Sequence, residues 1–184
     1  MMSDQTISGV NNLENFLPRY EVWLKEKRDL LEASDFTGGF KGYPWISNFG
    51  SPFTPFTGSL TGKTLAVVST AGLYLKGSQQ PFDAENIEGD PSFREIPLEA
   101  GREDLAIAHT HYNHESILAD LNAVYPLGIL SEMAYEGKVG KLAPRHYSIS
   151  GYCTRADLMA QETAPEIARR LVSDGVGVAL IIPV

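Results

Sequence analysis

The sequence has few features of a secreted or membrane-spanning protein. Cys153 is its one cysteine in 184 residues, so no intramolecular disulfide can form, and a lone thiol is typical of a reducing compartment. The N-terminal residues have neither the basic start nor the apolar core of a signal peptide. No apolar run approaches the roughly 20 residues that a transmembrane helix needs. These absences predict a cytoplasmic protein.

An excess of positive charge is also absent. The chain has 15 basic residues against 23 acidic ones, for a net charge of -8, and its basic residues form no block. Nucleic-acid binding requires a basic surface, so nucleic acid is not an expected partner. A chain of this length can bury about 70% of its unfolded surface, which is enough to build a core without a disulfide or a metal.

Residues 1–62 are expected to form a helix and an aromatic arm. An apolar stripe from Leu13 to Leu31 predicts an amphipathic helix, with Pro18 tolerated in its first turn. Residues 38–62 follow neither helical nor strand spacing and are too aromatic for a free linker. We expect an extended arm that buries its rings on its own chain or against another subunit. The rings in question include Trp45, Phe49, Phe53 and Phe56.

Residues 63–184 are expected to form an α/β domain. Apolar runs without polar breaks are typical of strands buried in a parallel sheet, and strands alternating with helices predict a doubly wound, mostly parallel sheet of the Rossmann or flavodoxin type. We expect strands at 63–70, 105–108, 142–152 and 176–184, helices at 127–136 and 164–173, and a long polar loop at 77–99. Thr163 is the predicted cap of the last helix. The sheet is expected to be incomplete at its C-terminal end.

Three of the four histidines fall between residues 109 and 114. His109, His111 and His114 directly follow the apolar run at 105–108. Because ligands of open α/β sheets bind beyond the carboxyl ends of the strands, we expect these imidazoles to gather near the 69–72 loop. His109 would then orient or protonate a substrate near neutral pH. The simpler alternative is a polar turn that only caps the next helix.

The same histidines suggest two other functions. His-x-His-x-Asn-His is similar to the His-x-His-x-Asp-His zinc motif of metallo-β-lactamase-type hydrolases, although Asn113 replaces the aspartate, and neutral imidazole is a common zinc ligand. A metal-dependent hydrolase with His109, His111 and His114 as ligands is therefore one alternative. A non-catalytic scaffold subunit, whose histidine loop stabilises an interface, is the other.

Arg94 lies in the long loop predicted at 77–99. Loops of this length are often functional, and Arg94 is the residue in it best suited to bind an anion. An ion pair with Asp90 or Glu95 on the surface is the alternative.

Five segments in order carry a family resemblance. From about Lys63 onward, the chain resembles the glycine/sarcosine/betaine/D-proline reductase selenoprotein B family. The segments are VVSTAGLYLKG, GDPSFREIP, AHTHYNHESILADLNAVYP, EGKVGKLAPRHYSISGY and APEIARRLVSDGVGVALIIPV. The resemblance implies a subunit of a selenoenzyme that reductively cleaves the carbon–nitrogen bond of an amino acid or its N-methylated relative. Tyr112-Asn113 matches the family's Tyr-Asp turn, and Asp120 and Asn122 match a later Asp-x-Asn.

The residue patterns and the resemblance together give a set of candidate site residues. His109 and Asn113 are the catalytic candidates. The substrate-binding candidates are Ser69, Thr70, Gly72, Arg94, His111, Asp120 and Asn122. Cys153 is not at the position of the family's nucleophile and is expected to be a small buried residue.

Cofactors and partners follow from the same resemblance. No cofactor is expected in this chain. Relatives continue into an active-site segment, so we expect a UGA codon and a selenocysteine just after Val184, and the chain alone should be inactive. A pyruvoyl group on a companion reductase subunit is expected as the electron sink. The other expected partners are a small amino-acid substrate, a thiol or selenoprotein electron donor, and a second copy of the chain.

Overall fold

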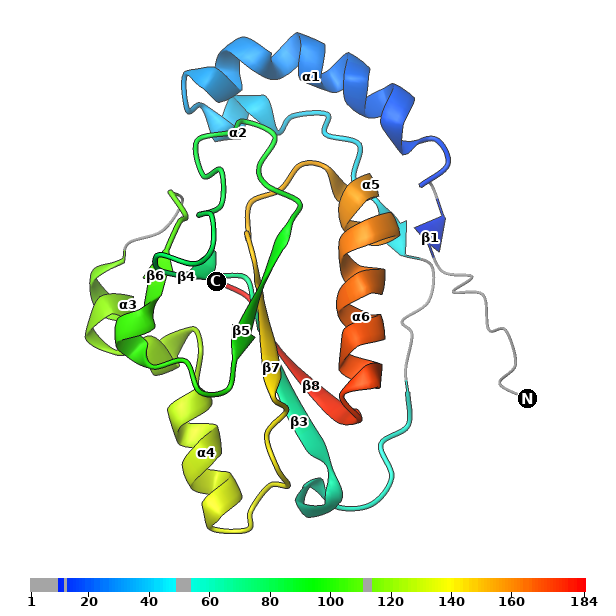
Figure 1. Cartoon of the computed structure of the whole chain (residues 1–184). Helices are drawn as coiled ribbons and strands as arrows, with labels where there is room; N and C mark the ends of the chain where they lie inside the picture. The colour runs from blue at the N-terminus through cyan, green and yellow to red at the C-terminus, as the bar shows by residue number, and fades with distance from the viewer. Residues whose placement is uncertain (1–9, 12, 49–53, 111–113) are drawn as a thin grey trace. The chain divides into compact units, whose positions relative to one another are not determined.

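The computed structural model describes residues 10–11, 13–48, 54–110 and 114–184 (Figure 1). It divides the chain into two compact units, Met1–Phe56 and Thr57–Val184, whereas the sequence predicted a boundary after residue 62. Within the described ranges, no helix is long and apolar enough to cross a membrane.

The first unit contains one long helix, one short helix and a pair of two-residue strands. Its elements are β1 (Val10–Asn11), α1 (Phe16–Glu32), α2 (Phe36–Gly39) and β2 (Ser47–Asn48), with β1 and β2 antiparallel. The predicted amphipathic helix is confirmed as α1, with Pro18 in its first turn. Trp23 is buried, and its indole N–H donates to the carbonyl oxygen of Gly39 at 2.9 Å. This bond fixes α2 against α1.

The aromatic arm is only partly as expected. Tyr43 is buried, with its ring centroid 4.9 Å from that of Trp23. Trp45 stacks on Phe40 but is 65% exposed, and Phe56 is also exposed. The other two predicted ring positions, 49 and 53, lie outside the described residues. Contact of this arm with another polypeptide stays a prediction.

The second unit contains the larger sheet and most of the helices. Its elements are η1 (Leu60–Gly62), β3 (Thr64–Ser69), β4 (Leu73–Leu75), β5 (Phe93–Pro97), η2 (Arg102–Asp104), β6 (Leu105–Ile107), α3 (Glu115–Ala119), η3 (Leu121–Ala123), α4 (Leu127–Tyr135), β7 (Arg145–Ile149), α5 (Ala156–Leu158), the π-helix η4 (Met159–Thr163), α6 (Ala164–Ser173) and β8 (Val176–Ile182).

A four-stranded sheet in the order β5-β7-β3-β8 forms the centre of this unit (Figure 1). β7, β3 and β8 are parallel, and β5 is antiparallel to β7. Every residue of β3 from Leu65 to Ser69 is buried, because β3 has strand neighbours on both sides and helices over both faces. The mixed α/β class with a mostly parallel sheet is confirmed, although the sheet is small.

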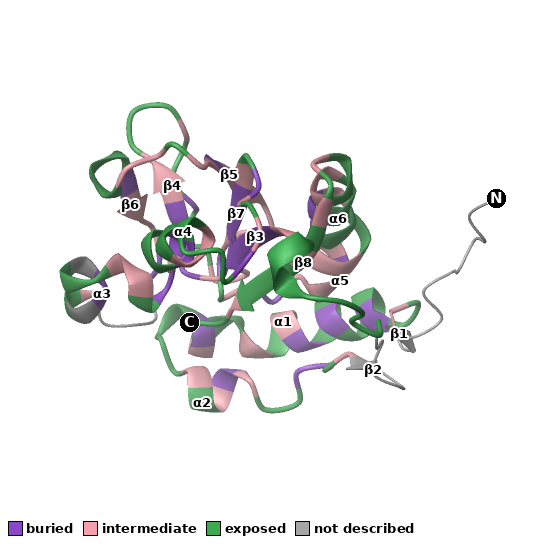
Figure 2. Ribbon diagram, turned by 90° about the horizontal axis from the view of Figure 1, so that it is seen from below, coloured by how far each residue is buried: buried purple, intermediate pink, exposed green. Residues whose placement is uncertain are grey.

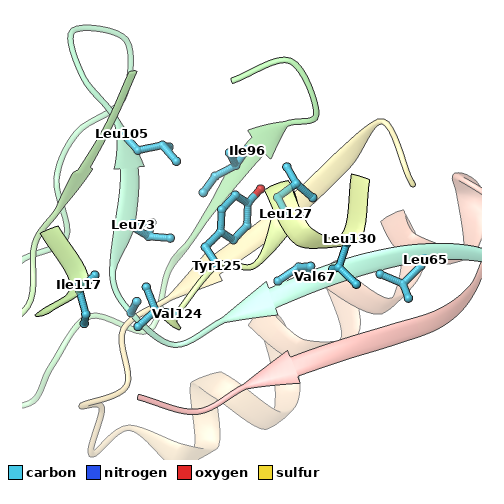
Figure 3. Close-up of a cluster of buried hydrophobic side chains, with 11 residues drawn as sticks. Leu65, Val67, Leu73, Ile96, Leu105, Ile117, Val124, Tyr125, Leu127 and Leu130 are labelled. Carbon is cyan, nitrogen blue, oxygen red and sulfur yellow. The ribbon is translucent and has the colours of Figure 1, made fainter. Parts of the chain in front are cut away.

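Alternate residues of β3 face two different cores. Val67 belongs to the larger core, together with Tyr125 and with Leu130 of α4 (Figure 3). Val68 faces the other side and packs in a smaller cluster that includes Ile167 of α6. Helices therefore cover both faces of the sheet, as the predicted doubly wound arrangement requires.

The predicted strand at 105–108 has a different partner from the expected one. β6 pairs with β4 in a separate antiparallel ladder, with Leu73 opposite Ile107. Gly72, at φ +69°, turns the chain out of β3, so that β4 leaves the main sheet and offers its edge to β6. The prediction that this run belongs to the parallel sheet is therefore wrong.

The prediction of a long loop before residue 99 is also wrong, whereas the last predicted strand is confirmed. The loop expected at 77–99 contains the strand β5, in which only Ile96 is fully buried. Because the residues around Ile96 are partly exposed, the sequence has no apolar run that would have predicted this strand. The strand predicted at 176–184 is present as Val176–Ile182. This strand, β8, is at the edge of the sheet and is drawn largely as exposed in Figure 2. Leu180 and Ile181 are among its exposed residues. An apolar run indicates a strand, but it does not indicate how many strands will flank it.

The predicted helices at 127–136 and 164–173 are confirmed as α4 and α6. The predicted side-chain cap at Thr163 is wrong, because helical structure already runs through α5 and η4 before α6 begins. The Thr163 hydroxyl donates instead to the carbonyl oxygen of Pro91, which attaches this helical run to the segment before β5.

Candidate functional site

The carboxyl ends of the parallel strands meet at one edge of the sheet. The Thr70 amide donates to the Ile182 carbonyl oxygen at the end of β8, at 3.0 Å. The Gly72 amide donates to the Ile149 carbonyl oxygen at the end of β7, also at 3.0 Å. These bonds fix the loop after β3 between the ends of its two neighbours, which is where ligands bind in open α/β sheets.

His109 reaches this edge from β6. The Ala108 amide donates to the Gly72 carbonyl oxygen at 2.9 Å. A Cβ atom on Gly72 would lie 2.5 Å from the Ala108 carbonyl oxygen and 3.3 Å from Cβ of His109. Only glycine therefore allows the two segments to approach this closely. The His109 side chain is buried, with 6% of its surface exposed.

Thr70, His109 and Gly151 converge at one point. A Cβ atom on Gly151 would lie 3.2 Å from Thr70 Oγ1 and 3.3 Å from His109 Nε2. The Val184 amide donates to the same Thr70 Oγ1 at 2.8 Å. We call Thr70, Gly72, His109 and Gly151 the edge cluster. The cluster places the His109 imidazole and the Thr70 hydroxyl beside Gly151, which has no side chain. An imidazole next to a hydroxyl can orient a small substrate and transfer a proton to it.

The histidine cluster can be followed only in part. His109 lies near the 69–72 loop, as expected, and His114 directly precedes α3. His111 and Asn113 lie outside the described residues. Within the part of the chain that the structure describes, no three His, Cys, Asp or Glu side chains are placed to hold one metal ion. The metal-site alternative therefore depends on His111.

Ser69 is completely buried and stabilises the loop from inside. Its Oγ accepts a hydrogen bond from the Ala71 amide at 3.2 Å. This contact holds the turn that leads to Gly72. A role for Ser69 in substrate binding stays a prediction.

Arg94 is held by its own loop. Its guanidinium donates to the carbonyl oxygens of Gln80 and Pro81 at 2.8 and 3.1 Å and to Ser92 Oγ at 2.7 Å. It also lies 3.7 Å from a carboxylate oxygen of Asp90. Because each guanidinium nitrogen already has a partner, the structure favours the ion pair with Asp90 over the anion-binding role that the sequence suggested.

Asp120 and Asn122 line a pocket that includes no residue of the edge cluster. Asp120 Oδ1 accepts from both the backbone amide and the side-chain amide of Asn122, at 2.9 and 3.0 Å. The pair thus forms a local turn at the start of η3. Their predicted contact with substrate stays a prediction.

Sequence reasoning missed several residues that build the site. Gly151 was predicted only as part of the strand at 142–152. Its closeness to His109 depends on the pairing of β4 with β6, which the sequence did not predict. His146 and Ser148, both fully buried in β7, accept hydrogen bonds from the backbone amides of Val67 and Leu73, at 3.0 and 2.8 Å. Polar residues alternating within a strand were the available signal.

Burial changes the proton affinity of two side chains of the second unit. It lowers the pKa of His146 to about 4, so this imidazole is neutral at physiological pH. It raises the pKa of the partly buried Cys153 thiol to about 11. Since the thiolate is the nucleophilic form, Cys153 is poorly suited to attack a substrate.

Comparisons with known proteins agree on one family. Residues 59–183 match the family model for glycine/sarcosine/betaine reductase selenoprotein B. Over 129 residues the chain is 33% identical to the D-proline reductase subunit gamma of Acetoanaerobium sticklandii, covering 70% of this chain and 52% of that protein. Over 135 residues it is 28% identical to the glycine reductase complex component B subunit gamma of Carboxydothermus hydrogenoformans, covering 71% and 30% respectively.

The chain thus spans about half the length of the first relative and less of the second. No solved structure is significantly similar to it.

Proposed function

Because this chain belongs to the glycine/sarcosine/betaine reductase selenoprotein B family, we propose that it is a subunit of a multisubunit cytoplasmic reductase. The reaction is the reductive cleavage of a carbon–nitrogen bond in glycine, sarcosine, betaine or a D-proline-type substrate. The family match supports this, since it includes every strand of the larger sheet. The names of both relatives describe subunits, which supports a companion subunit for this chain.

The reaction requires a reductant and a soft nucleophile. The carbon–nitrogen bond breaks, a carbon–hydrogen and a nitrogen–hydrogen bond form, and a dithiol that is oxidised to its disulfide supplies two electrons and two protons. An ordinary thiol has a pKa of about 8.5 and is mostly protonated in the cell. The pKa of Cys153 is higher still. A selenol is far more acidic, so a selenolate meets the requirement better.

We place this nucleophile on a selenocysteine bonded to Val184. The supporting observation is the hydrogen bond from the Val184 amide to Thr70 Oγ1. A residue joined to Val184 would start beside the edge cluster, within reach of a substrate held there. A pyruvoyl group on the companion subunit would supply an electron-withdrawing carbonyl when bound.

His109 is proposed to handle the proton of the leaving nitrogen. Imidazole is the side chain best suited to proton transfer near neutral pH. The observation that carries this assignment is the convergence of Thr70, Gly151 and His109 Nε2 at the carboxyl edge. Thr70 and Gly151 would shape the space in which the substrate lies.

The test is turnover by the complex co-expressed with its companion subunit, with a dithiol as reductant. Released amine, or the ring-opened amino acid from proline, would be quantified alongside dithiol oxidation. His109→Gln should lower kcat by about 100-fold or more, because general acid–base catalysis contributes roughly 10²–10⁴-fold. His114→Gln is the matched control and should retain turnover.

No dithiol-dependent turnover, together with stoichiometric zinc in the wild-type protein that is lost in His111→Ala, would instead favour the metal-dependent hydrolase. Unchanged turnover of His109→Gln at every pH would remove the proposed role of His109.

A further inference from the structure

A groove of about 420 Å³ lies along α1 and the loop that follows α2. All of its lining residues belong to the first unit, which ends at Phe56. The family match begins at residue 59. The groove therefore belongs to a unit outside the matched domain.

Two buried residues, Trp23 and Pro44, give the groove a fixed wall. The Trp23 indole N–H donates to the Gly39 carbonyl oxygen at 2.9 Å, and its ring meets that of Tyr43 edge-on, with the centroids 4.9 Å apart. These contacts hold α1 against the segment that carries Lys41. A surface that is ordered before binding loses little conformational entropy when it binds.

The charges along the groove are mostly positive. Arg19, Lys27 and Lys41 line it, against the single carboxylate of Glu26, for a net charge of +2. The whole chain has a net charge of -8, so this is a local reversal of sign. Arg19 and Lys41 are exposed and Lys27 is half-buried, so a partner in solution can contact all three.

These three cations are also unpaired. Among the residues that the structure describes, none of their side chains has a hydrogen-bond or ion-pair partner. By contrast, the arginines of β7 and α6 all form ion pairs. Val22, which also lines the groove, is 59% exposed. The groove thus combines unpaired positive charge with an accessible apolar side chain, which is complementary to an acidic segment with an apolar residue.

The spacing of the cations fits a peptide better than a single small anion. Arg19 and Lys27 are eight residues apart in α1, a rise of about 12 Å at 1.5 Å per residue. One carboxylate or phosphate group between them would require both long side chains to bend toward each other, at a cost in rotamer entropy. An extended segment of about four residues covers the same length at roughly 3.3 Å per residue.

We propose that this groove docks an acidic segment of the companion subunit. Carboxylates of that segment pair with Arg19, Lys27 and Lys41, and one apolar side chain packs on Val22. The identity of the partner rests on the proposed function, in which this chain works with a companion. A nucleic acid is the less suitable polyanion, because its phosphates would face a chain with a net charge of -8.

A second copy of the chain is a poorer occupant. The most acidic segment of its second unit is residues 83–90, with four carboxylates. Within that segment, the Asp83 amide donates to Asp90 Oδ2 at 3.0 Å. The Glu88 carbonyl oxygen accepts from the Thr154 amide at 2.8 Å. These bonds keep the segment folded on itself, so it would have to unfold locally to lie along a groove.

The experiment measures binding of the full 184-residue chain to short synthetic peptides that overlap along the companion subunit, by fluorescence anisotropy. A peptide of this chain's residues 81–95 and a single-stranded DNA oligonucleotide are the comparison probes. We expect the tightest binding from a peptide with several carboxylates and an apolar residue. Binding should weaken as salt is added, because exposed ion pairs are screened.

Charge reversal tests the groove itself. Arg19→Glu and Lys27→Glu should each weaken peptide binding about 5-fold, the change expected when an exposed ion pair becomes a like-charge contact. Lys25→Glu is the matched control and should retain wild-type affinity, because Lys25 is exposed on the same helix but does not line the groove. All three variants should unfold at the wild-type temperature, as surface substitutions usually do. Replacing an acidic residue of the bound peptide by lysine should restore affinity for Lys27→Glu.

Four results would overturn the proposal. They are no binding of any companion peptide at millimolar concentration, bound peptides without acidic residues, equal losses in Lys25→Glu and Lys27→Glu, and tighter binding of either comparison probe than of the companion peptides.

The assembled complex separates this proposal from the proposed function. Lys27→Glu should weaken association of the subunits and leave kcat of the assembled complex unchanged. Association through the groove without dithiol-dependent turnover would refute the reductase and leave the docking site standing. Turnover by a complex that Lys27→Glu assembles as well as the wild type does would refute the docking site alone.

Discussion

Gly72→Ala is expected to destabilise the second unit at the edge cluster. Gly72 has φ +69°, a conformation that costs a residue with a Cβ about 1–2 kcal/mol. The new Cβ would also lie 2.5 Å from the Ala108 carbonyl oxygen, a backbone atom that must move. That movement disrupts the bond from the Ala108 amide to the Gly72 carbonyl oxygen, which contributes about 0.5–1.5 kcal/mol. The free energy of unfolding should fall by roughly 1.5–3.5 kcal/mol.

Gly77→Ala separates the two contributions. Gly77 has nearly the same backbone conformation, at φ +73°, but nothing lies within 4 Å of its added Cβ. The free energy of unfolding of Gly77→Ala should fall only by the cost of the positive φ, about 1–2 kcal/mol. Urea unfolding of both variants measures the difference, and hydrogen exchange at the Ala108 amide should be faster only in Gly72→Ala. Equal destabilisation and equal exchange would refute the close approach of β4 and β6.

Three further predictions concern the second unit. Burial lowers the pKa of His146 to about 4 in the folded state, so the imidazole of the unfolded chain takes up its proton at a higher pH. The free energy of unfolding should therefore decrease by up to roughly 3 kcal/mol as the pH falls from about 6.5 to 4. His146→Asn should flatten this pH dependence. Arg94→Gln should lower the free energy of unfolding by about 1–3 kcal/mol, measured by urea unfolding. An increase in KM at unchanged stability would instead favour the anion-binding role of Arg94. Gly151→Ala should leave stability within about 1 kcal/mol of wild type but lower turnover of the assembled complex, since its methyl group would enter the space between Thr70 and His109; unaffected turnover would argue against a site there.

The regular elements were predictable because their signals are local. The apolar stripe of α1, the helical segment of α6 and the apolar run of β3 each depend on residues close together in the chain. Hydrophobic periodicity reports the face that an element buries. These elements accordingly lie where the sequence placed them.

Strand partners were not predictable in the same way. β6 has three residues, and whether it joins the main sheet or pairs with β4 depends on the turn at Gly72. β8 has the composition of a central strand, yet in the described structure it pairs with β3 alone. Pairing is a property of distant segments, which no local pattern contains.

The candidate site was only partly predictable, because it too depends on which distant strands pair. The position of His109 near the 69–72 loop agrees with the structure, although β6 brings it there by a different route from the parallel strand that was expected. Gly151 joined the site only once the strands were placed. For Arg94, the sequence offered two roles, and the hydrogen bonds to Gln80 and Pro81 favour the structural one.

The most direct test of the central claim is dithiol-dependent cleavage of a carbon–nitrogen bond by the complex that contains this chain. Purified complex would be supplied in turn with glycine, sarcosine, betaine and D-proline, and amine release or ring opening would be measured against dithiol oxidation. We predict one product and one disulfide per turnover with at least one substrate, and loss of this activity when the chain is omitted. No turnover with any of the four, or full activity without the chain, would contradict its assignment as a reductase subunit.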